Sequence, residues 1–97
     1  MQFRRAWLFI CLLFGSLLAC QQNLAVPDDA TLVYYGPVTT STQIGGMLPM
    51  DQEDLNRQVY VYDDNLGKIV AVRTVDGQHR DVNFQWVQGH RYRIYFY

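Results

Sequence analysis

The second half of the chain alternates between apolar and polar residues with the period of two that is typical of half-buried β-strands. Residues 59–62 place valines on one side and tyrosines on the other, and residues 68–75 are rich in β-branched residues. Residues 80–87 and 90–97 alternate in the same way. The apolar side of these segments predicts a core made of Val59, Val61, Val82, Phe84, Trp86, Tyr92, Ile94 and Phe96.

The first half of the chain carries weaker signals. Residues 30–35 are β-branched and aromatic and precede a Gly-Pro pair, which predicts a strand followed by a turn. The Thr-rich residues 38–44 predict a second, weaker strand. Asp51 is a suitable N-cap, so one or two helical turns are expected over residues 51–56. The chain is therefore expected to be mainly β: a small antiparallel meander or sandwich of four to six strands, with at most one short helix near residues 51–56.

The polar side of the predicted sheet is rich in tyrosine and arginine, which are enriched at binding hot spots. These side chains predict a surface that binds a partner. In the alternative interpretation, this side packs on the first strand and the Tyr34-Tyr35 region, forming a two-layer sandwich. The predicted partner-binding residues are Tyr60, Tyr62, Arg91, Arg93, Tyr95 and Tyr97.

The N-terminus has the order of a secretory signal peptide. Arg4 and Arg5 precede a short apolar run over residues 7–14, which small residues then interrupt. A membrane-spanning helix needs roughly 20 apolar residues, and this run is shorter. A cleaved signal is therefore expected, and an uncleaved N-terminal membrane anchor is the alternative.

The sequence Leu17-Leu18-Ala19-Cys20 closes this region and resembles the lipobox of bacterial lipoproteins. The resemblance implies cleavage before Cys20 and attachment of several acyl chains, such as palmitate, to that cysteine. Residues 1–19 would then be the signal peptide, residues 20–29 the lipidated cysteine and a tether, and residues 30–97 a small β domain. Gln21 stands where members of the family retained in the inner membrane carry Asp, so a periplasm-facing position on the bacterial outer membrane is expected.

Composition narrows the possible chemistry. After cleavage the chain keeps six basic and nine acidic residues without a basic cluster, so nucleic acid is not an expected partner. Cys11 lies in the signal and Cys20 carries the lipid, which leaves no thiol for a disulfide, a metal or a nucleophile. His79 and His90 lack zinc-site spacing, and Ser41 lacks a nucleophile-elbow setting. We expect no enzyme activity, no cofactor and no metal.

Three segments of the second half share a pattern with a known class of β domain. Residues 61–70 contain an Asp-x-x-Gly-Lys turn, residues 74–77 read Thr-Val-Asp-Gly, and residues 88–94 read Gln-Gly-His-Arg-Tyr-Arg-Ile. This pattern resembles the transthyretin-like, or carboxypeptidase-regulatory-like, β-sandwich domains. The resemblance implies a binding or structural role rather than chemistry.

These observations together indicate a membrane-anchored lipoprotein whose β domain binds a protein of the cell envelope. An alternative is an inhibitor or exclusion lipoprotein that acts on lysozyme or on a phage receptor. A third possibility is self-association through the C-terminal strand, provided that this strand lies at an edge of the sheet and is open to pairing.

Overall fold

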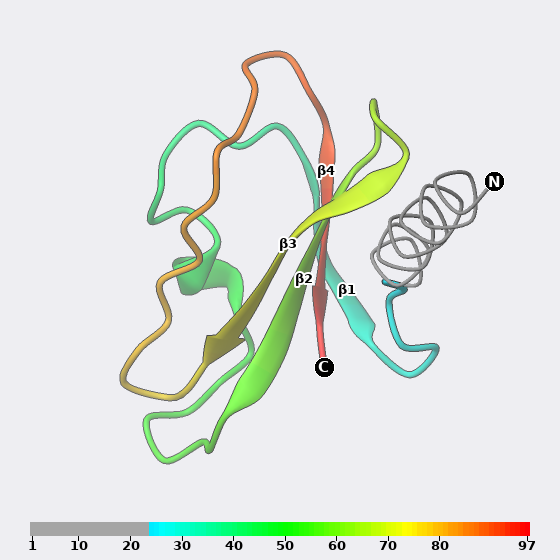
Figure 1. Ribbon diagram of the computed structural model, residues 1–97. Coiled ribbons are helices and arrows are strands. Elements are labelled where there is room, and N and C mark those ends of the chain that lie inside the picture. The colour runs from blue at the N-terminus through cyan, green and yellow to red at the C-terminus, as the bar shows by residue number, and fades with distance from the viewer. Residues whose placement is uncertain (1–23) are drawn as a thin grey trace, which may run out of the picture.

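The computed structural model describes residues 24–97 and is mainly β, with four antiparallel strands in one sheet (Figure 1). The strands are β1 (Thr31–Gly36), β2 (Arg57–Asp63), β3 (Lys68–Val75) and β4 (Tyr92–Phe96). The one helical element of this range is a 3-10 turn, η1 (Gly45–Met47). The predicted mainly β, antiparallel fold is confirmed. The predicted signal peptide and the lipidated Cys20 lie outside the described residues.

The strand order is β1-β4-β2-β3, which differs from a simple meander. β2 and β3 form a hairpin, but β4 pairs with the other side of β2 and so lies between β1 and β2. The register places Val59 opposite Phe96 and Val61 opposite Ile94, which brings four buried apolar side chains together. The condition set for self-association through the C-terminal strand is not met, because β4 is paired on both sides. The edge strands are β1 and β3.

The strand expected over residues 80–87 is absent, although its side-chain alternation is present. Val82 is buried and Phe84 and Trp86 are half-buried, whereas Asn83 and Gln85 are exposed. In the described part of the chain, no backbone-to-backbone hydrogen bond joins this segment to β3, although the Asn83 carbonyl accepts from the Arg73 side chain at 2.9 Å. A period of two therefore indicates an extended chain with one buried side. Such a chain need not be hydrogen-bonded to a neighbouring strand.

The strand expected over residues 38–44 and the helix expected over residues 51–56 are also wrong. Residues 40–44 form turns, in which the amide of Thr39 donates to the side chain of Gln43. Further on, the Asp54 carboxylate accepts from the Asp51 amide at 2.9 Å. The Asp54 carbonyl accepts from the Gly77 amide at 3.0 Å. The Asp54 carbonyl is thus bonded to the turn after β3, and a helix does not form.

The loops build the second layer of the molecule. In Figure 1 the long connections 37–56 and 76–91 gather on one side of the sheet. They bury apolar side chains against that side, and the sandwich layer predicted as strands is therefore made of irregular chain. Within residues 24–97, no helix is long and apolar enough to cross a membrane. The buried apolar residues are Val38, Ile44, Leu48, Met50 and Val82 from the loops and Val59, Val61, Ala71, Val75, Tyr92, Ile94 and Phe96 from the sheet.

Candidate functional site

The side of the sheet away from the loops 37–56 and 76–91 carries the tyrosines that the sequence predicts there. The register places Tyr60 opposite Tyr95 and Tyr62 opposite Arg93, so these four side chains share one side of β2 and β4. Side chains directly opposite in an antiparallel pair lie within contact distance. We call this surface the tyrosine face and define it by Leu32, Tyr35, Tyr60, Tyr62, Ile69, Arg93 and Tyr95.

β1 contributes Leu32 and Tyr35 to the tyrosine face because its register shifts between Leu32 and Tyr34. The shift places Tyr35 opposite Arg93, and Tyr34 opposite the buried Ile94. The Tyr34 hydroxyl donates to the carbonyl of Pro37 at 2.5 Å, on the loop-covered side. The interpretation in which the first strand packs across the tyrosine face is wrong, because β1 joins the same sheet beside β4.

A polar network fixes the centre of this surface. The Tyr35 hydroxyl donates to one oxygen of Asp64 at 3.0 Å, and Arg93 Nε lies 3.1 Å from the other. The guanidinium carbons of Arg93 and Arg91 lie 5.2 and 5.9 Å from the centre of the Tyr35 ring, within the range of cation–π attraction. The Tyr95 side chain, followed by the Asp64 carboxylate, raises the pKa of Arg93, so its guanidinium stays charged.

The β2–β3 turn is held by the buried carboxylate of Asp63, which is 1% exposed. One of its oxygens accepts from the amides of Asn65 and Leu66 at 2.9 and 3.0 Å, and the other lies 2.8 Å from His90 Nδ1. Burial raises the pKa of Asp63, but the bonds from His90 and from the two amides outweigh it, and the pKa lies below its ordinary value of 3.8.

Two further bonds join the same turn to the chain that enters β4. The Asp64 amide donates to the Arg91 carbonyl at 2.8 Å, and the Arg91 amide donates to the Asn65 side chain at 2.7 Å. Together with the Asp63–His90 contact, they hold Asp64 where it meets Arg93. The electrostatics of the tyrosine face therefore depend on this turn.

The lowered pKa of Asp63 predicts how stability changes with pH. A carboxyl group that binds its proton more weakly in the folded than in the unfolded state stabilises the fold above its ordinary pKa. That stabilisation is lost as the pH falls through the lower, folded pKa. We expect Asp63→Asn to lower the free energy of unfolding at neutral pH by about 1.5–3 kcal/mol, the range for hydrogen bonds to charged groups. The decline in stability below pH ~4 should also become shallower.

Urea unfolding, followed by circular dichroism from pH 2 to 7, measures both effects. Asp81→Asn is the matched control, because Asp81 is exposed. Part of the acid sensitivity should remain in Asp63→Asn, since bonds from the Gln78 amide and then His79 also lower the pKa of Asp76, against the effect of burial. Identical acid curves for wild type and Asp63→Asn would contradict the assignment.

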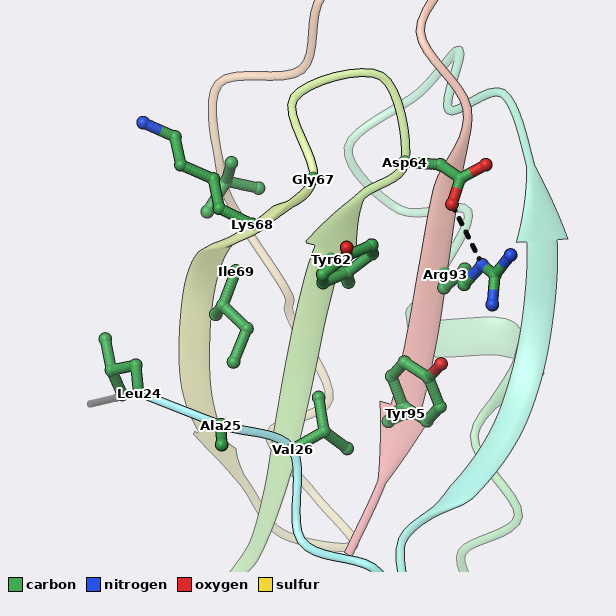
Figure 2. Close-up of a pocket in the computed structure, with 11 residues that line it drawn as sticks. Leu24, Ala25, Val26, Tyr62, Asp64, Gly67, Lys68, Ile69, Arg93 and Tyr95 are labelled. Carbon is green, nitrogen blue, oxygen red and sulfur yellow. Dashed lines mark ion pairs between the residues drawn. The ribbon is translucent and has the colours of Figure 1, made fainter. Parts of the chain in front are cut away.

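An open groove of about 1050 Å³ lies over β2 and β3 on the tyrosine face and reaches Arg93 and Tyr95 of β4. Figure 2 shows Leu24, Ala25 and Val26 crossing in front of β3 and β2, with the Asp64–Arg93 ion pair at the other side of the groove. Residues 24–26, expected within the tether, thus form one wall of the groove. The lining residues are Leu24, Ala25, Val26, Tyr62, Asp64, Gly67, Lys68, Ile69, Val70, Arg93 and Tyr95.

The remaining predicted site residues lie at the margins or outside the described chain. Arg91 precedes β4 and stands over the Tyr35 ring, and the exposed Tyr97 follows β4 and exchanges backbone bonds with Gln58. Cys20 and the preceding Leu17, Leu18 and Ala19 are not described. Sequence reasoning missed Leu32, Tyr35, Asp64, Lys68 and Ile69, because a bulge in β1 and the packing of residues 24–26 have no local signature.

The described residues show few arrangements suited to metal binding or catalysis. In residues 24–97, no group of three or more His, Cys, Asp or Glu side chains could hold a metal ion. Each histidine faces one aspartate, His79 at 3.0 Å from Asp76 and His90 at 2.8 Å from Asp63. Comparisons with protein-family models, with curated proteins and with solved structures found no match to this chain. The tyrosine face is therefore the candidate functional site.

Proposed function

We propose that this chain is a lipoprotein of the bacterial outer membrane, anchored through Cys20 and facing the periplasm, whose β domain binds a protein of the cell envelope. The observation that carries the binding role is the alignment of Tyr60, Tyr62, Arg93 and Tyr95 on the one side of the sheet that the loops leave open. Catalysis has no part in this proposal.

The composition and order of the tyrosine face support binding to a protein. Tyr35 is 45% and Leu32 is 48% exposed, so apolar area is available without unfolding any part of the domain. The ion pair with Asp64 and the contact with Tyr35 hold Arg93 in place. Pre-ordered aromatic and arginine side chains lose little conformational entropy when they bind. The protein-contacting area is centred on β1 and β4.

The proposal is tested by shortening the side chains at the centre of this area and measuring whether the partner still binds. Lipidated protein carrying Tyr35→Ala or Arg93→Ala is extracted from membranes and compared with wild type for captured envelope proteins. Truncation of a hot-spot side chain costs about 2 kcal/mol or more, which is roughly a 30-fold loss of affinity. We expect each variant to lose the partner that wild type retains, with unchanged circular dichroism.

Leu55→Ala is the matched control. Leu55 is 84% exposed and belongs to the loop at the other end of β2, away from Tyr35 and Arg93. It should capture the same partner as wild type. Equal capture by all three variants would contradict the assignment of the tyrosine face, and loss of capture by Leu55→Ala alone would move the binding site to that loop.

A further inference from the structure

The chain enters the domain across the tyrosine face, and this determines which side of the sheet points toward the anchor. Leu24 is 57% exposed and Val26 is half-buried, and both line the groove beside Tyr62 and Ile69 (Figure 2). The covering loops lie on the opposite side of the sheet. Leu24, the first described residue, therefore lies on the groove side of the sheet.

The distance to the proposed anchor is short. Cys20 precedes Leu24 by four residues, and an extended chain spans at most about 14 Å over that length. A lipid on Cys20 thus holds the edge of the groove within about 14 Å of the bilayer surface. A folded domain of ordinary size has a radius of gyration of about 13 Å, so it does not fit between the groove and the membrane.

The charges and apolar groups around the groove suit a lipid surface. Lys68 and Arg93 line it, and Asp64 is its one acidic residue and already pairs with Arg93. Leu24 and Leu66, in the adjacent turn, are both more than half exposed. Basic side chains are attracted to anionic headgroups, and tyrosine and leucine are favoured at the boundary between headgroups and acyl chains.

Four acidic residues next to the start of β2 and the end of β3 lie at the other end of the sheet. The loop that leads into β2 ends at that end of the sheet, whereas the groove lies toward the β2–β3 turn. The seven residues of β2 separate the two by about 23 Å. Turning the groove to the membrane therefore holds these acids away from anionic headgroups. The acids near that end are Asp51, Glu53 and Asp54, before β2, and Asp76, after β3.

We propose that the groove half of the tyrosine face lies against the headgroups of the bilayer that holds the Cys20 anchor, with Lys68 on lipid phosphates and Arg93 kept in its pair with Asp64. The inference rests on the anchor in the proposed function. The β1–β4 half, with Leu32 and Tyr35, remains open at the side for a protein partner in or beside the same membrane. The groove thereby orients the domain on the lipid surface.

Depth-dependent quenching tests this orientation in the lipidated protein. The chain after residue 19 contains no cysteine except Cys20, whose thiol carries the lipid, so Ile69→Cys and Leu55→Cys each accept one fluorescent label. Each variant is reconstituted in vesicles of phosphatidylethanolamine and phosphatidylglycerol that contain a headgroup spin-labelled lipid. We expect loss of fluorescence at position 69 and none at position 55. Adding Lys68→Glu, or replacing phosphatidylglycerol with phosphatidylcholine, should reduce the loss at position 69.

The outcomes separate this inference from the proposed function. The mass of the reconstituted protein is measured first, and a mass without lipid overturns both. A lipidated protein whose label at position 69 is unquenched in pure lipid vesicles overturns the inference alone, as does equal quenching at positions 69 and 55. Shielding of position 69 only after a membrane protein is added would show that a protein occupies the groove instead of lipid.

Discussion

Replacing Cys20 with alanine is expected to remove the protein's mature, membrane-bound form. If the Leu17-Leu18-Ala19-Cys20 sequence acts as a lipobox, the wild-type protein extracted from membranes has the mass of residues 20–97 plus lipid. The variant lacks the thiol that receives the lipid and should keep residues 1–19. Mass spectrometry of the membrane extract measures both, and several acyl chains give stable anchoring where one gives only marginal binding.

Cys11→Ala is the matched control for this change. Cys11 lies inside the apolar run of residues 7–14, in the proposed signal, so its loss should leave the mature mass and the membrane retention unchanged. A full-length, unmodified mass in the wild type would contradict the lipoprotein assignment and favour an N-terminal membrane anchor instead. The orientation inferred for the groove would then be overturned as well, because no lipid on Cys20 would hold the domain at the bilayer.

The second large effect is expected in the loop layer. Ile44→Ala should lower the free energy of unfolding by about 2–5 kcal/mol, the range for truncating a buried isoleucine and leaving a cavity. Ile44 is 1% exposed although it precedes η1 in an irregular segment, and it packs in the same cluster as Val59 and Ile94. Whole domains are stable by only about 5–15 kcal/mol, so this variant should be close to unfolding.

Urea unfolding of Ile44→Ala, Ile94→Ala and Leu55→Ala compares how much a buried loop residue, a buried strand residue and an exposed loop residue contribute to stability. Ile44→Ala and Ile94→Ala should lower the free energy of unfolding by similar amounts. Both side chains are fully buried, so each truncation removes a similar amount of apolar contact. Leu55→Ala should change stability by less than about 0.5 kcal/mol, as is usual for exposed positions. An effect of Ile44→Ala as small as that of Leu55→Ala would show that the loops are not part of the cooperative core.

Several features could be predicted from local sequence because they depend on local periodicity. The alternation of valine and tyrosine in β2 predicts which side of the strand is buried, and Val59 and Val61 are fully buried. The alternation in β4 predicts Tyr92, Ile94 and Phe96 equally well. A side-chain period of two follows from the pleat of an extended chain, whatever its neighbours are.

Pairing partners could not be predicted in this way. Residues 80–87 alternate as clearly as β4, yet β4 takes the place beside β2. The reason is tertiary: β4 fits between β1 and β2 with buried side chains opposite Val59 and Val61, while residues 80–87 cover the same side of the sheet as a loop. Adjacent strands in the sequence are often neighbours in a sheet, and here that tendency is overridden.

The candidate site also combines features that local sequence predicts with features that it does not. The sequence by itself determined that Tyr60, Tyr62, Arg93 and Tyr95 share one side, because each strand is regular over those positions. Only the tertiary structure decided that this side stays open, that Tyr35 joins it through a bulge, and that residues 24–26 cross it. Local periodicity specifies the direction of a side chain. Whether that side chain is exposed depends on which distant segments pack against it, and this is a property of the tertiary structure.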